Sequence, residues 1–241
     1  NYVKKKNGAR RDKVKQTSAA IAELQAVIDG GEATEEQRTE LARLKAEYDS
    51  LPKEDFKAII GCEVYVARRG LQFKDGKQDQ SGWHLILLAK NKTGYKNLIK
   101  IVSKAWTDGF YMRPRTDHAE LEKYHEGLIC CSACLGGEMP RLIREGKIEE
   151  AKAAALWYKN LFGDDYYLEL QLHKATVEHA NHDTWKIQEV VNEHLIKMSQ
   201  KLGIKLVCTN DVHFVDEEHA EAHDRLICLG TSKDFNDPKR M

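Results

Sequence analysis

The chain has 241 residues, of which 38 are basic and 38 acidic, so its formal net charge at pH 7 is zero. This length allows one large domain or two small ones with a sizeable core. The balanced charge does not indicate a nucleic-acid or membrane partner, and no apolar run approaches the roughly 20 residues that span a bilayer. Six cysteines without regular spacing do not match a disulfide framework, which favours a reduced, cytoplasmic protein.

Residues 16–51 differ in composition from the rest of the chain. Apolar residues recur there at helical spacing on both sides of Gly30 and Gly31, which predicts a helical hairpin. Thr34 and Gln37 offer a capping box for the second helix. The apolar stripe is thin and its flanks are charged, so we expect a surface hairpin without chemistry.

From residue 56 the pattern changes to alternating strands and helices. This alternation predicts an α/β fold with a parallel sheet, and the lack of a Gly-rich phosphate fingerprint favours a barrel. The predicted strands are 57–60 running into 62–67, 85–89, 128–131, 166–172 and 205–208. The predicted helices are 95–106, 119–123, 139–145, 148–162 and 185–202, the last followed by a C-cap glycine at Gly203.

The last predicted strand is followed by Asp211-Val212-His213. Side chains two residues apart at a strand end point the same way, because side-chain direction alternates with period 2. A carboxylate and an imidazole that converge there form half of a divalent-metal site, or a base with its orienting partner.

Four more residues with ligand or catalytic chemistry lie near other strand ends, where a parallel barrel collects its chemistry: Glu63, His84, Cys134 and His173. Such side chains on separate elements of one sheet are suited to a hydrolytic metal site. Each also has a structural alternative. Glu63 could be an edge-strand charge, and His84 a satisfied core histidine. Cys134 could be a small buried residue, and His173 a solvated strand end.

Seven ordered segments of the sequence resemble one known family. They are Ile-Ile-Gly-Cys-Glu-Val-Tyr-Val, Trp-His-Leu-Ile-Leu-Leu-Ala-Lys-Asn, Gly-Tyr-Lys-Asn-Leu-Ile-Lys-Ile-Val-Ser, Gly-Phe-Tyr-Met-Arg-Pro-Arg, Cys-Ser-Ala-Cys-Leu-Gly-Gly-Glu, Tyr-Tyr-Leu-Glu-Leu-Gln and Thr-Asn-Asp-Val-His-Phe. Over residues 56–241 they resemble the polymerase-and-histidinol-phosphatase (PHP) domain at the amino end of bacterial DNA polymerase III alpha subunits. The helical hairpin looks like a lineage insertion.

The resemblance implies a distorted, seven-stranded (β/α)7 barrel that holds several divalent metal ions, whether Zn, Mn or Mg. The family's ligand positions fall on five residues of this chain: Glu63, His84, Cys134, Asp211 and His213. His173 matches no assigned family ligand and stays a further site candidate. His84 also precedes its apolar run, although the barrel rule expects ligands after strands.

The chain departs from the family at its beginning. The family pattern opens with a His-x-His segment, an Asp and a further His, and none of these precedes Glu63 here. The chain starts at Asn1 rather than Met, so we expect a piece of a longer protein whose first barrel strands are absent. The expected organisation is a basic remnant of a barrel helix, the inserted hairpin, the C-terminal part of the barrel and the start of a linker to a polymerase domain, at 1–15, 16–55, 56–230 and 231–241.

The resemblance implies a part of a replicative DNA polymerase with a metal-dependent phosphoesterase site for 3′–5′ proofreading. Its partners would be primer-template DNA and other replisome subunits, with no membrane. Arg113 and Arg115 could hold phosphates, since a guanidinium fork matches phosphate oxygens; a solvated loop is the alternative. Two other functions stay open: a non-catalytic module that supports the polymerase core or docks a proofreading partner, and a stand-alone phosphatase for a small monoester.

We predict that the isolated 241-residue chain does not assemble the complete metal centre, because it lacks the upstream ligands. Metal content per chain, measured by mass spectrometry after loading with Zn²⁺ or Mn²⁺ and desalting, should stay below that of a longer protein containing the His-x-His segment. A fully loaded cluster on the isolated chain would contradict this prediction.

Overall fold

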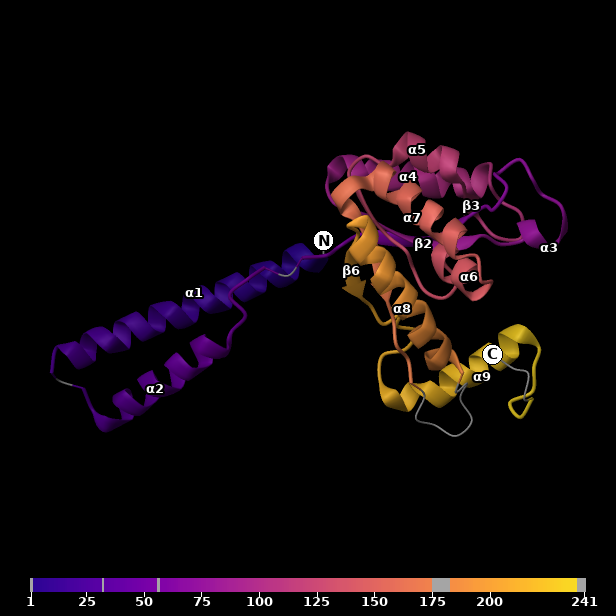
Figure 1. The fold of residues 1–241 in the computed structure, drawn as a ribbon. Helices are drawn as coiled ribbons and strands as arrows, with labels where there is room; N and C mark the ends of the chain where they lie inside the picture. The colour runs from indigo at the N-terminus through magenta and orange to yellow at the C-terminus, as the bar shows by residue number, and fades with distance from the viewer. Residues whose placement is uncertain (1, 32, 56, 175–182, 238–241) are drawn as a thin grey trace. The chain divides into compact units, whose positions relative to one another are not determined.

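The computed structural model describes all residues except 1, 32, 56, 175–182 and 238–241. It divides into two compact units, Asn1–Ile59 and Ile60–Met241. The helices of the first unit are α1 (Tyr2–Asp29) and α2 (Glu35–Ser50), which pack side by side as a hairpin (Figure 1).

The predicted break between the two helices of the hairpin is confirmed. Gly31 follows α1 with a φ of 82°, a conformation that glycine adopts without a steric penalty. The predicted capping box is also confirmed, because the Thr34 hydroxyl accepts from the Gln37 amide at 3.3 Å and the Gln37 side chain accepts from the Thr34 amide at 2.9 Å. Helix α1 runs without interruption through residue 15, so the expected boundary there falls inside one helix.

The second unit is built on one six-stranded sheet with the order β3-β1-β2-β4-β5-β6. The strands are β1 (Gly61–Val66), β2 (Trp83–Ala89), β3 (Arg115–Thr116), β4 (Leu128–Cys131), β5 (Tyr166–Leu170) and β6 (Lys205–Cys208). The predicted α/β class is confirmed, and a mixed sheet of this kind is consistent with the expected PHP-type barrel.

The sheet is mixed, so the prediction of a parallel sheet was wrong. Strand β2 runs antiparallel to both β1 and β4, while the remaining neighbours are parallel. The connection from β1 to β2 contains only the four-residue helix α3 (Gly76–Asp79). Without a full crossover helix, the chain returns beside β1 in the opposite direction.

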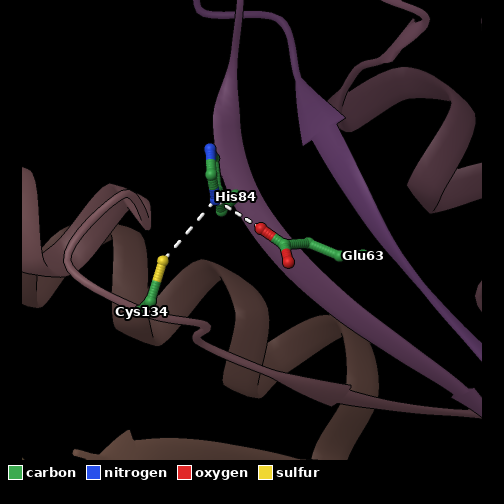
Figure 2. Close-up of side chains that lie close together, drawn as sticks. All are labelled: Glu63, His84 and Cys134. Atoms are coloured by element: carbon green, nitrogen blue, oxygen red, sulfur yellow. Dashed lines mark hydrogen bonds and ion pairs between the residues drawn. The ribbon is translucent and has the colours of Figure 1, made fainter. Parts of the chain in front are cut away.

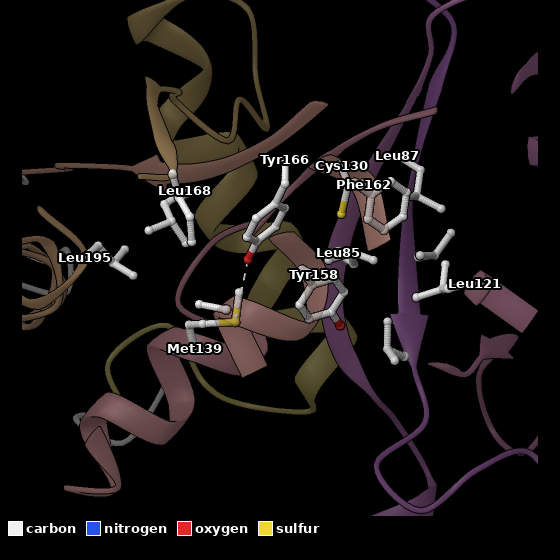
Figure 3. Close-up of a cluster of buried hydrophobic side chains, with 14 of the residues drawn as sticks. Leu85, Leu87, Leu121, Cys130, Met139, Tyr158, Phe162, Tyr166, Leu168 and Leu195 are labelled. Carbon is white, nitrogen blue, oxygen red and sulfur yellow. Dashed lines mark hydrogen bonds between the residues drawn. The ribbon is translucent and has the colours of Figure 1, made fainter. Parts of the chain in front are cut away.

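The helices of the second unit supply most of its core. Besides α3, they are α4 (Lys92–Thr107), α5 (His118–Tyr124), α6 (Glu138–Arg144), α7 (Ile148–Phe162), α8 (Thr184–Leu202) and α9 (Ala220–Thr231). Leu85 and Leu87 of β2 are buried in the core with Leu121 of α5 and Tyr158 and Phe162 of α7 (Figure 3). Because side chains alternate along a strand, the residues between these leucines point to the other face of the sheet.

The predicted strands and helices after residue 60 all occur, with ends shifted by a few residues. The predicted strand at residues 57–60 is wrong, because these residues are not in a strand. The Ile60 carbonyl accepts a hydrogen bond from the Ala89 amide, next to the first pair of the β1–β2 ladder. The predicted C-cap is confirmed: Gly203 has a φ of 64° after α8. Strand β2 begins at Trp83, so His84 lies inside the strand and not before it.

Two further findings bear on the class of protein. In the described part of the chain, the helices are too short or too polar to cross a bilayer. All six cysteines are free thiols, and three of them, Cys130, Cys131 and Cys228, are buried.

The contact between Gly94 and Gly127 offers a test of the fold. A Cβ on Gly94, in the first turn of α4, would lie 1.7 Å from the Gly127 carbonyl oxygen. Gly94→Ala should therefore lower the free energy of unfolding by about 1–3 kcal/mol, because the backbone must shift to accept the methyl group. Urea unfolding followed by circular dichroism measures the loss.

The matched control is Gly230→Ala in α9, where a Cβ meets nothing within 4 Å. This change should leave stability unaltered or raise it by up to about 1 kcal/mol, since alanine favours the helix. Equal effects of the two substitutions would contradict a role for the Gly94–Gly127 contact in packing α4 against the segment that leads into β4.

Candidate metal centre

Strands β1 and β2 place Glu63 and His84 on the face of the sheet opposite the core. The register pairs Tyr65 with His84, and Glu63 lies two residues before Tyr65 on the same face. The rings of Tyr65 and His84 meet edge to face with centroids 5.0 Å apart. The Glu63 carboxylate forms an ion pair with Nδ1 of His84. Antiparallel pairing therefore brings a carboxylate and an imidazole into direct contact.

Cys134 reaches the same imidazole from the loop between β4 and α6. Its Sγ lies 3.5 Å from His84 Nδ1 and accepts a bond from the Gly136 amide at 3.4 Å. The Gly136 carbonyl in turn accepts from the His84 amide at 3.0 Å. A Cβ on Gly136 would lie 2.9 Å from Cγ of the His84 ring, so glycine permits this close approach.

The ligand atoms of Glu63, His84 and Cys134 all lie within 4.8 Å of one another (Figure 2). A carboxylate oxygen, an imidazole nitrogen and a thiolate sulfur are the donors that zinc and related divalent metals use in proteins. The residues come from two strands and one loop, so the fold and not local sequence assembles them. This donor set fits a metal ion.

The contacts of this group favour a protonated His84 whose Nδ1 faces Glu63 and Cys134. Contacts with Cys134 first, and then with Glu63, raise the pKa of His84 to about 9 against the cost of burial. The hydrogen bond with His84 lowers the pKa of Glu63, opposed by burial. The two shifts agree on an imidazolium paired with a carboxylate, which is the state that a metal ion would displace.

Asp211 and His213 lie near this group but outside it. Strand β6 ends at Cys208, so strand alternation does not orient the pair as the sequence predicted. Asp211 has a φ of 47°, and its carbonyl accepts from His213 Nδ1 at 2.7 Å, while its carboxylate lies 4.0 Å from that nitrogen. The charge of His213 lowers the pKa of Glu63, which places the imidazole within electrostatic reach of the candidate metal centre.

The other predicted site residues have different surroundings. His173 follows β5, where its amide and Nδ1 contact the Gln188 side chain of α8 at 2.7 and 2.9 Å. Arg113 is exposed and lies over the ring of Tyr65, 5.9 Å from its centroid. Arg115 is fully buried and donates to the carbonyls of Gly109 and Phe73, so its side chain is not placed to hold a substrate phosphate.

Glu169 of β5 is a buried acid that the sequence patterns did not single out. Its residue is 6% exposed, and its Oε2 is buried without a partner in the described part of the chain. Burial raises its pKa, opposed by hydrogen bonds from Thr209 and from the Ala133 amide. Its own amide donates to Ser132 Oγ at 2.8 Å. Glu169 therefore links the loop that carries Cys134 to the loop that carries Asp211.

One signal could have identified Glu169. It is the only acidic residue in the run Tyr166-Tyr-Leu-Glu-Leu-Gln. The other residues of this run have aromatic, aliphatic or amide side chains. A single carboxylate in a buried strand is costly unless hydrogen-bonded, so such a residue is expected to serve a site.

A carboxylate, an imidazole and a thiol that converge on one face of an α/β sheet form a group that could hold a metal ion. The sequence model of the PHP domain matches residues 12–173, and the chain belongs to the PHP domain family. The matched segment contains Glu63, His84 and Cys134 and ends before Asp211 and His213.

The chain is similar to bacterial proteins named DNA polymerase III subunit alpha. It is 47% identical to that of Borreliella burgdorferi over 197 residues, which is 80% of this chain and 16% of the relative. It is 44% identical to that of Treponema pallidum over 78% of this chain and 15% of the relative, and 38% identical to that of Campylobacter jejuni over 80% and 16%. The chain thus spans about a sixth of the length of these relatives.

The His84 contacts predict how protons and metal compete. In the chain freed of metal by a chelator, His84 should titrate near pH 9, and metal affinity should rise as pH approaches that value, because the imidazolium cannot bind metal. Since this folded pKa lies above the unfolded value of about 6.5, the pair's contribution to stability is full below pH 6.5 and is lost as pH rises through 9.

Imidazole resonances followed by NMR across pH 6 to 10 measure this midpoint. Cys134→Ser should lower the midpoint, because the thiol contact is the largest cause of the shift. Cys208→Ser removes an exposed thiol from β6 and should leave it unchanged. A His84 midpoint near 6.5 in the unsubstituted chain would contradict the contact geometry.

Proposed function

We propose that this chain is part of a replicative DNA polymerase alpha subunit and that its PHP domain carries a metal-dependent phosphoesterase site. The reaction is removal of nucleotides from the 3′ end of a primer strand. The observation that carries the proposal is the convergence of Glu63, His84 and Cys134 within 4.8 Å on one face of the sheet. Relatives of 37–47% identity named DNA polymerase III subunit alpha support the parent assignment.

The residues of this chain that would hold metal are Glu63, His84 and Cys134, with Asp211 and His213 from the segment after β6. A bound divalent metal would activate water and stabilise the negative charge that develops on the phosphodiester. The thiolate favours a soft or borderline ion such as Zn²⁺ over Mg²⁺. Glu169 holds the two ligand-bearing loops together through its bonds with Ala133 and Thr209.

Arg113 is the predicted phosphate contact that the geometry supports. Its guanidinium lies over Tyr65, and the Tyr65 ring touches His84, so the cation stands one side chain away from the candidate metal centre. An exposed guanidinium in this place can orient a phosphate for attack. We further propose that the parent protein works in the cytoplasm with primer-template DNA and other replisome subunits.

Replacing ligands in the longer protein tests the proposal. Asp211→Asn and His213→Asn should each reduce 3′–5′ exonuclease activity by at least about a hundredfold, since outer-shell changes alone cost about 10–100-fold, and EDTA should abolish it. Primer extension by the same protein should change less than about twofold, because we assign no residue of this chain to nucleotide addition.

The matched controls are Asp216→Asn and His219→Asn, which remove exposed side chains of the same types a few residues away. Both should retain full exonuclease activity. The opposite pattern, with primer extension lost and nuclease activity unchanged in the Asp211 and His213 variants, would overturn the catalytic proposal and support a structural module of the polymerase.

A further inference from the structure

The described arginines of the second unit fall into two groups. Three have fixed partners: Arg69 pairs with Asp75 and Asp79, Arg115 with backbone carbonyls, and Arg225 with Glu221. Within the described residues, the guanidinium groups of the other four form no ion pair with a carboxylate; these are Arg68, Arg113, Arg141 and Arg144. Arg113 lies over Tyr65 at the candidate metal centre, as described above.

Three arginines are here called the arginine cluster: Arg68, Arg141 and Arg144. Arg141 and Arg144 lie three residues apart on α6, and so on one face of that helix. The charges of Arg68 and Arg144 both act on the guanidinium of Arg141, and so does the charge of Cys134. Arg141 is on α6, the helix that begins after the Cys134 loop, and its amide donates to the Gly137 carbonyl at 3.1 Å. Arg141 therefore lies one helical turn after Gly137, whose own amide donates to the Cys134 carbonyl at 2.8 Å.

The arginine cluster is electrostatically unfavourable by itself. Arg141 is half-buried, and its Nε is buried without a hydrogen-bond partner in the described part of the chain. Burial first, and then the charges of Arg68 and Arg144, lower the pKa of Arg141. The buried donor without an acceptor costs free energy, and so do the two like charges that act on Arg141; a bound anion would recover both costs.

Glu145, a carboxylate whose charge acts on Arg141, is already engaged. Glu145 forms an ion pair with Lys147 at 2.8 Å, and both side chains are about half exposed, at 55% and 48%. Its field reaches Arg68 and Arg141 without an ion pair to either. The net charge of Glu145, Lys147 and the arginine cluster together stays strongly positive.

We propose that the arginine cluster binds the sugar-phosphate backbone of a single DNA strand that leads to the candidate metal centre. This inference rests on the proposed function, since it names how that site would hold its substrate. A guanidinium fork binds phosphate oxygens in pairs, and several guanidiniums match the repeated charge of a strand better than the single phosphate of a small monoester. Arg141 is the central residue because its Nε is a buried donor without a partner among the described residues, and because the charges of both other arginines act on it.

Binding of a fluorescent oligothymidylate of about 12 nucleotides to the full chain tests this, by anisotropy in EDTA over a series of salt concentrations. Arg141→Gln should weaken binding about five- to tenfold at low salt and reduce the slope of log affinity against log salt by about 0.7, the value for one lost phosphate contact on a single strand. Arg141→Lys should keep most of the slope, because the charge remains.

The matched control is Arg38→Gln, which removes the same charge from an exposed position of the first unit, on α2. It should change affinity less than about twofold. Circular dichroism spectra and melting curves of all variants identify any that fail to fold, and the Arg68→Gln and Arg144→Gln variants, at exposed positions, then carry the test.

Three outcomes would overturn the inference. One is equal weakening by Arg141→Gln and Arg38→Gln, and another is unchanged binding in every cluster variant. The third is competition by thymidine monophosphate as effective as that by the oligonucleotide, which would assign the cluster to a small phosphate monoester. The binding assay contains EDTA, so its result does not depend on a bound metal ion. The exonuclease assay of the Asp211 and His213 variants therefore tests the proposed function separately from this inference.

Discussion

The ion pair between Glu63 and His84 connects the two strands on which the candidate metal centre is built. It exists because β2 runs antiparallel to β1 and its register places His84 opposite Tyr65, two residues from Glu63. A parallel β2 would have needed a crossover helix and a different set of facing residues. The direction of one strand therefore decides which ligand candidates meet, and the thiol of Cys134 is added to an existing pair.

The loop that carries Cys134 is shaped by its backbone as much as by its ligand. Ala133 has a φ of 62°, a left-handed conformation that is uncommon for alanine, and Gly136 packs against the imidazole ring. Glu169 then bonds to the Ala133 amide and to Thr209, so the loops after β4 and β6 share one buried acid. Local strain beside Cys134 is compensated by contacts from a neighbouring strand.

Sequence patterns identified the elements and the candidate ligands Glu63, His84 and Cys134 but not how they meet. The alternation of strands and helices suggested a parallel sheet. The sequence of the loop before β2 shows its length and polarity, but it does not show the direction in which the chain returns beside β1. Asp211 and His213 were expected to share a strand face, yet β6 ends before them. Arg115 resembles a phosphate contact in sequence, and only packing shows that it is buried.

Strand β2 carries the core and the candidate metal centre on alternate residues, with His84 on one face and Leu85 and Leu87 on the other. A slip of one residue in its pairing would turn the histidine into the core and a leucine toward the ligands. Misregistered chains would thus lose apolar packing and metal binding together. Cellular quality control that recognises exposed apolar surface would then remove the chains that also lack the ligand arrangement, although it does not recognise the ligands themselves.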